Sequence, residues 1–149
     1  MKFSKILLYI VSIGALVISI FIFEGFGKTT LVSNRTGSTQ FGDFTLHIRV
    51  EEENHEVKVF RSIQYRGEKP VEIKHQTPLI SVSLGKKNHD FTGSTLKKTL
   101  NPGNSYYPQS ARIMKVPEKA GVYTLYCLAE FELDGKIEKI EYSEKLTFE

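Results

Sequence analysis

Cysteine and tryptophan are almost missing from this chain of 149 residues. It has no tryptophan and a single cysteine, Cys127. One cysteine excludes an intramolecular disulfide, so packing alone has to stabilise a folded domain. Cys127 would act as a nucleophile only beside a histidine that activates it. Because it lies between Leu125 and Ala129 in an alternating apolar stretch, we expect a small core residue instead.

An excess of charge of one sign is also missing. The chain has 20 lysines and arginines against 17 carboxylates, and two of the lysines, Lys2 and Lys5, belong to the amino terminus. This balance excludes the strongly basic surface typical of nucleic-acid-binding proteins, so we expect no nucleic-acid partner. Scattered solubilising charge is the favoured interpretation of the other basic residues. The alternative is a patch facing anionic lipid headgroups or wall polymers, made by Lys86, Lys87, Lys97, Lys98, Arg112, Lys115 and Lys119.

The longest uncharged run spans residues 6–23, between Lys5 and Glu24. A run of about eighteen apolar residues is long enough to cross a bilayer as a helix. It predicts a transmembrane anchor, and the two leading lysines place residues 1–5 in the cytoplasm and the rest of the chain outside. A cleaved signal peptide, which would make the protein secreted, is the alternative. The run is longer than most signal sequences, and Gly25-Phe26-Gly27 matches their cleavage pattern poorly.

The stretch FEGFGKTT ends in Gly27-Lys28-Thr29, the last three residues of a phosphate-binding loop. That loop also needs a glycine five positions before Gly27, a strand before it and a helix after it. This chain has Ile22 at that position, inside the apolar run, and a hydroxyl-rich segment follows. We therefore expect no nucleotide and no other cofactor.

A period-two alternation of apolar residues begins after residue 40. Residues 24–40 contain few large apolar side chains, and we interpret them as a flexible stalk. Short apolar stretches with turn residues between them then follow as far as residue 149, which predicts one all-β domain over residues 41–149, a sandwich or barrel of seven to eight antiparallel strands. The expected strands cover residues 44–50, 57–65, 71–75, 79–84, 96–100, 105–116, 123–133 and 136–142, with a charged turn at 51–56 and an edge segment at 145–149.

The clearest hairpin of this pattern is the last one. Asp134-Gly135, between two alternating stretches, is a preferred pair for a two-residue type I′ turn, in which both residues have positive φ. Proline cannot donate to a strand ladder, so Pro108 indicates an edge or a bulge. One strand face before the turn carries Tyr123, Leu125, Cys127, Ala129, Phe131 and Leu133.

The segments LNPGNSYY and EKAGVYTLY, at residues 100–107 and 118–126, resemble bacterial immunoglobulin-like domains, most closely the Ig-like domain of the bacterial proteinase-inhibitor type. The resemblance covers residues 57–131. It implies an Ig-like antiparallel β-sandwich. The uncharged run at residues 6–23 adds one N-terminal transmembrane helix before this sandwich. The resemblance also implies that Tyr123, two residues after Gly121, forms a tyrosine corner. Leu125 stands where antibody-type domains have a cysteine, and no residue marks an inhibitory reactive loop.

Catalytic and metal-binding patterns are weak. The four histidines, His47, His55, His75 and His89, have no metal-ligand spacing, although His47 and His75 could meet across strands. No serine lies in a G-x-S-x-G turn. We therefore expect neither an enzyme nor a metal site.

The favoured hypothesis is a membrane-tethered extracytoplasmic Ig-like interaction module of a bacterial envelope. Loops such as residues 85–93 would contact a protein or envelope-polymer partner. The alternatives are an envelope protein that binds a metal ion or an anionic polymer, and a secreted protein with a cleaved signal peptide.

Overall fold

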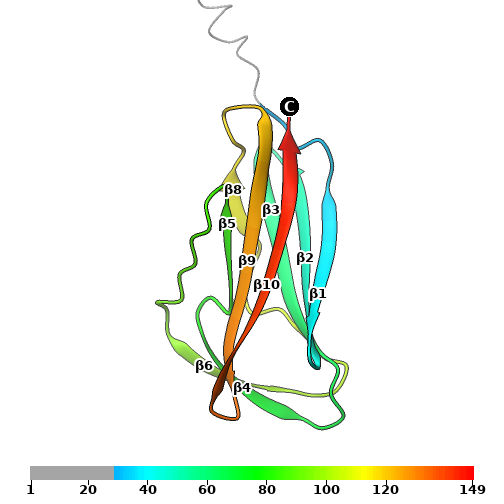
Figure 1. Cartoon of the computed structure of the whole chain (residues 1–149), viewed down its shortest axis with the longest axis vertical. Coiled ribbons are helices and arrows are strands. Elements are labelled where there is room, and N and C mark those ends of the chain that lie inside the picture. The colour runs from blue at the N-terminus through cyan, green and yellow to red at the C-terminus, as the bar shows by residue number, and fades with distance from the viewer. Residues whose placement is uncertain (1–28) are drawn as a thin grey trace, which may run out of the picture.

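The computed structural model describes residues 29–149, which form an all-β domain of two antiparallel sheets packed as a sandwich (Figure 1). The predictions for the cytoplasmic residues 1–5, the transmembrane run 6–23 and residues 24–28 of the stalk lie outside the described residues. Within residues 29–149 no helix has the length and apolar character needed to cross a bilayer. Thr30 and Glu149 bond to each other through both main-chain groups, so the two ends of the domain lie side by side.

One sheet is built around a long hairpin near the amino end of the domain. Its order is β1-β2-β3, and the far edge of β3 pairs with β7 and, further along, with β8. Pro108 lies in the gap between β7 and β8, where it interrupts the single strand predicted over residues 105–116. The strands are β1 (Arg35–Phe41), β2 (Phe44–Glu53), β3 (Glu56–Tyr65), β7 (Ser105–Tyr106) and β8 (Arg112–Lys115).

The other sheet is built around the carboxyl-terminal hairpin. Its order is β10-β9-β4-β6, and β5 pairs with β9 beyond the end of β4. The strands are β4 (Val71–Gln76), β5 (Ile80–Leu84), β6 (Thr95–Leu100), β9 (Gly121–Leu133) and β10 (Lys136–Phe148).

The core between the sheets comes from alternate residues of the long strands. Leu46, Ile48 and Ile63 of one sheet face a matching set on the other, because successive side chains of a strand point to opposite faces. Leu125, Cys127, Ala129 and Phe131 are all buried, as predicted for that face of β9.

Several predicted elements differ from those of the structure. The structure has ten strands in residues 29–149 instead of seven to eight, partly because β7 and β8 are separate pieces. The stalk prediction fails for residues 29–40. Residues 35–40 belong to β1, which pairs with β2 over its whole length, and Leu31 bridges to Phe148. An edge strand needs only main-chain pairing on one side, so a hydroxyl-rich segment can form it without an apolar alternation.

The predicted turn at residues 51–56 is also displaced. Glu51 to Glu53 continue β2, and the turn is Asn54-His55 alone, with φ of 55° and 61°. The final hairpin agrees with its prediction, because Asp134 and Gly135 have φ of 50° and 76° and Leu133 pairs with Lys136. Strand β10 then continues without a break to Phe148 instead of ending at Tyr142.

Candidate binding cleft between β5 and β8

The most unusual core residue is Arg61, in the middle of β3. It occupies the inward-facing row of that strand, between Val59 and Ile63, and only 8% of its surface is exposed. A charged side chain in such a row is costly unless its hydrogen-bonding groups are satisfied. The signal for Arg61 in the sequence is an arginine in phase with the apolar residues of a strand, and Arg61 was not among the predicted site residues.

The guanidinium of Arg61 connects the two sheets. Its Nε donates to the carbonyl oxygen of Ile80 in β5 at 3.0 Å, and its Nη1 donates to the carbonyl of Val59 at 3.2 Å. Burial lowers the pKa of Arg61, and the nearby cation Arg112 lowers it further. No carboxylate among residues 29–149 forms an ion pair with Arg61. The site therefore holds a buried cation whose partners are main-chain dipoles.

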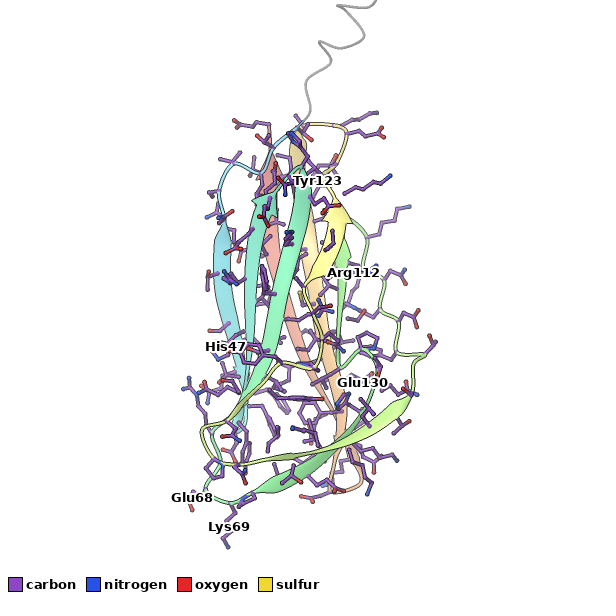
Figure 2. All side chains as sticks on the ribbon, turned by 180° about the vertical axis from the view of Figure 1, so that it is seen from behind. His47, Glu68, Lys69, Arg112, Tyr123 and Glu130 are labelled. Carbon is purple, nitrogen blue, oxygen red and sulfur yellow. The ribbon has the colours of Figure 1, made fainter. Side chains whose placement is uncertain are left out.

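Arg61 lies at a cleft of about 660 Å³ on the side of the sandwich where β5 and β8 are the edge strands. Figure 2 shows Arg112 at the end of β8, on this side of the molecule. Two apolar residues of the cleft, Val82 of β5 and Met114 of β8, are partly buried and pack on the core. The complete lining is Arg61, Thr77, Pro78, Ile80, Ser81, Val82, Ser83, Leu84, Asn88, Asp90, Thr92, Arg112, Met114 and Lys115.

Strand β5 turns unpaired main-chain groups toward this cleft. Glu130 N–H donates to Leu79 C=O, and Gly85 N–H donates to Thr124 C=O, so the odd-numbered residues of this stretch bond to β9. In an antiparallel pair such residues alternate with residues whose N–H and C=O point to the other side. The N–H and C=O of Val82 therefore point away from β9. The C=O of Ile80 also points away from β9, because it accepts a hydrogen bond from Arg61.

The loop that follows β5 runs back beside it without pairing with it. Near Thr77 the loop is bonded through the main chain, from Gly93 N–H to Thr77 C=O and from Thr77 N–H to Ser94 C=O. Further along, the contacts pass through serine side chains. The hydroxyl of Ser81 accepts from Asp90 N–H at 3.2 Å, and Ser83 accepts from Asn88 N–H at 3.1 Å. The loop predicted to contact a partner is thus held one side chain away from β5, and it lines one wall of the cleft.

The charge of the cleft is mainly positive. Three cationic residues, Arg61, Arg112 and Lys115, line the cleft together with a single carboxylate residue, Asp90. One oxygen of Asp90 already accepts the main-chain N–H of Thr92. Like charges kept close together in a partly buried site favour an anion, because an anion relieves their repulsion and replaces lost hydration.

The other residues of the predicted basic patch do not join this cleft. Lys87 pairs with Glu141, and Lys97 of β6 pairs with Glu72. Their charges are therefore locally neutralised on the second sheet. The folding of the chain brings Arg112 and Lys115 to Arg61, whereas the sequence grouped them with distant lysines.

The structural residues predicted from the sequence lie near the end of the domain that carries the termini, or on the β9–β10 hairpin. Tyr123 donates its hydroxyl to the carbonyl of Lys119 at 2.9 Å, the geometry of a tyrosine corner, and its ring packs edge-on against Phe148. Gly121 is the first residue of β9. Burial raises the pKa of the Cys127 thiol to about 12.

The histidines do not come together. His47 lies on β2 and contacts Gln64 on β3, whereas the buried His75 of β4 contacts Tyr106 at 3.2 Å. In the described part of the chain no group of three histidine, cysteine or acidic residues is placed to hold a metal ion.

A second hollow of about 500 Å³ lies beside His47, lined also by Phe60 and Tyr107. Tyr107 is 72% exposed. This hollow is also lined by Arg49 and Arg61 and by no carboxylate. The cleft between β5 and β8 differs from it in the unpaired main-chain groups of β5.

No family model matches this chain, and no curated protein matches it. Among solved structures, it is similar to the GAE domain of GGA2p from Saccharomyces cerevisiae. The two are 12% identical with a TM-score of 0.40, and the match covers 78% of this chain and 96% of that domain. The comparisons give no link to the bacterial proteinase-inhibitor type.

Proposed function

We propose that this chain is a membrane-tethered, extracytoplasmic interaction module of a bacterial envelope, with an Ig-like domain that binds its partner in the cleft between β5 and β8. The uncharged run at residues 6–23 supports the tether, and Lys2 and Lys5 support the orientation. The tyrosine corner at Tyr123 supports an Ig-like assignment of the sandwich. The module is not an enzyme.

One observation carries the binding role, the buried cation of Arg61 at a cleft whose edge strands are free. An isolated domain gains little stability from an arginine in this row, because the charge loses hydration and meets no carboxylate. A partner that supplies an anion would compensate that loss. This makes Arg61 a recognition residue that the free domain keeps at some energetic cost.

The thiol of Cys127 supports a non-catalytic role. With a pKa raised to about 12, it is protonated near neutral pH and does not offer a nucleophilic thiolate.

Site-specific photo-crosslinking in intact cells tests this proposal. A photoreactive amino acid replaces Lys115 in the cleft or, as a matched control, Lys69 at the opposite end of the domain (Figure 2). We expect a discrete covalent adduct from the Lys115 position and none from Lys69. The same adduct from both positions, or none from either, would exclude the cleft as the partner site.

The topology is tested in the same cells. Protease added to intact protoplasts should digest the domain while the amino-terminal part stays in the membrane fraction. A mature form that begins near Lys28 and appears in the medium would instead establish the alternative, a secreted protein.

A second candidate function is binding of an anionic envelope polymer. Arg61, Arg112 and Lys115 in one cleft favour it, because a polyanion would neutralise all three. A steep loss of binding with rising salt concentration is its signature.

A further inference from the structure

We propose that the ligand of the cleft is an extended polypeptide segment that adds to β5 as a new strand and places a carboxylate side chain against Arg61 and Arg112. This inference rests on the proposed binding role of the cleft. The partner would be recognised through two elements, main-chain pairing with β5 and an ion pair with the arginines.

The edge of β5 provides the main-chain element. Val82 pairs with Cys127 at a position where its own N–H and C=O point away from β9 and toward the cleft. The neighbouring carbonyl, that of Ile80, already accepts from Arg61. An incoming strand would find free groups at Val82 and Leu84, and strand addition of this kind obtains its affinity from main-chain hydrogen bonds.

The loop beside β5 does not pair with the main chain of this edge. Neighbouring strands lie about 4.8 Å apart, a spacing set by direct main-chain hydrogen bonds. The loop instead reaches β5 through the hydroxyls of Ser81 and Ser83, so its own main chain is bonded to side chains and leaves the β5 main chain unpaired. Natural proteins cover or blunt a free edge that has no function. Here the loop forms no main-chain hydrogen bond with residues 80–84 of β5.

The arginines provide the charge element. Arg61 is held at the inner end by its bonds to Ile80 and Val59, and the exposed Arg112 lies close enough to lower its pKa. A carboxylate between them would make charge-assisted hydrogen bonds with both, which are stronger than bonds between neutral groups.

The walls distinguish a polypeptide from a polyanion. Val82, Leu84 and Met114 are apolar and partly buried, and they offer contacts to alternate side chains of a strand. A phosphate polymer gains nothing from apolar walls or from free N–H and C=O groups in strand geometry. The combination therefore favours a peptide with one acidic residue among apolar ones.

The decisive variant is Val82→Pro, measured on the full chain in detergent micelles. Proline removes the N–H that points into the cleft and leaves the ladder to β9 intact, since Val82 does not donate to β9. Val82→Thr is the matched control, because it keeps both the N–H and the β-branched shape. The probes are peptides selected on the wild-type chain from a random displayed library and labelled for fluorescence polarisation, together with inorganic polyphosphate.

We expect the selected peptides to carry an acidic residue and to lose at least about tenfold in affinity with Val82→Pro, whereas Val82→Thr leaves their affinity nearly unchanged. Arg112→Gln, an exposed position whose loss leaves the core intact, should weaken binding by about tenfold through the ion pair. Lys98→Gln on β6 is its control and should have no effect on peptide affinity.

Amide hydrogen exchange gives a second measurement that does not depend on a variant. In the free protein the amide of Val82 should exchange quickly and that of Ser83 slowly, because only Ser83 donates to β9. Bound peptide should slow the exchange of Val82 and Leu84.

Each other outcome overturns the inference. Equal peptide affinities for Val82→Pro and Val82→Thr, or no slowing at Val82, would exclude strand addition. Polyphosphate that binds tightly and responds to Arg112→Gln but not to Val82→Pro would identify a polyanion site. If a Lys115 adduct forms in cells under either outcome, the interaction module stands and only the class of its ligand is wrong. If no adduct forms, the proposed function itself fails.

Discussion

The two lateral sides of the sandwich are closed in different ways. On one side β1 and β10 approach each other, Leu31 bridges to Phe148, and the ring of Tyr142 lies directly over Gly37. On the other side β5 and β8 leave the cleft at Arg61 between them. The closed side is filled by apolar and aromatic contacts, whereas the open side keeps a charged group and free strand edges. Under the proposed binding role, the domain places its stability on one side and its recognition on the other.

The largest expected effect is the loss of Phe148 on the closed side. Phe148 is fully buried one residue before the end of the chain and packs against Tyr123. Phe148→Ala should lower the free energy of unfolding by about 3–5 kcal/mol, measured by denaturant titration. Met114→Ala on the open side, where the side chain is only partly buried, should cost about 1 kcal/mol, below the usual range for full burial. Equal costs would mean that the two sides do not differ in their contribution to stability.

Gly37→Val tests the closest contact of the closed side. A Cβ at this position would stand 2.1 Å from the Tyr142 hydroxyl oxygen, so the valine should destabilise the domain by about 1–3 kcal/mol. The stalk prediction implied the reverse, a silent change, because it assigned no fixed structure to this residue. In a background of Tyr142→Leu, the cost of Gly37→Val should be smaller, since the clashing ring is gone. If Gly37→Val cost the same in the Tyr142→Leu background, the destabilisation would not come from a clash with the Tyr142 ring.

Gly135→Val should destabilise the domain by about 1 kcal/mol or more, because a β-branched residue is strained at a φ of 76°. This turn fixes the register in which Tyr142 pairs with Cys127, and so it also positions the ring that covers Gly37. Asp134→Asn, which tolerates the same left-handed conformation, is the control and should be nearly neutral. A silent Gly135→Val would show that register is set by the core instead of the turn.

Cys127 lies between the two sides, and the ionisation of its thiol has the smallest effect on stability at neutral pH. Burial raises its pKa from 9.0 to about 12, while Arg61 partly opposes that shift. The folded state therefore holds this proton more tightly than the unfolded state does. The resulting stabilisation is complete below pH 9 and is lost as the pH rises toward 12, by up to about 1.4 kcal/mol per pH unit.

Two measurements check this assignment. The free energy of unfolding of wild type relative to Cys127→Ala should fall between pH 9 and 12 and stay constant below pH 9. Thiol reagents should label Cys127 only when the domain unfolds, and fast labelling of the folded protein at pH 8 would contradict its burial. Cys127→Ser should cost about 1–3 kcal/mol if its hydroxyl finds no partner.

The sequence predicted the elements whose signals are local. The β9–β10 hairpin followed from an apolar alternation and an Asp-Gly pair, and the tyrosine corner at Tyr123 was implied by the resemblance of residues 118–126 to Ig-like domains. In contrast, β1 has almost no apolar residues, so nothing local distinguishes it from a linker. Its partner β2 supplies the hydrogen bonds, and that partner is known only once the chain is folded.

The candidate cleft depended on the tertiary structure more than any other feature. By itself the sequence determined an all-β domain, its buried faces and its best turn, because alternation and turn chemistry act between near neighbours in the chain. The meeting of Arg61, Val82 and Arg112 joins three strands that are far apart in sequence. Only the packing of two sheets decides which edges stay open and which cation is buried beside them, since both depend on how distant segments share one interior.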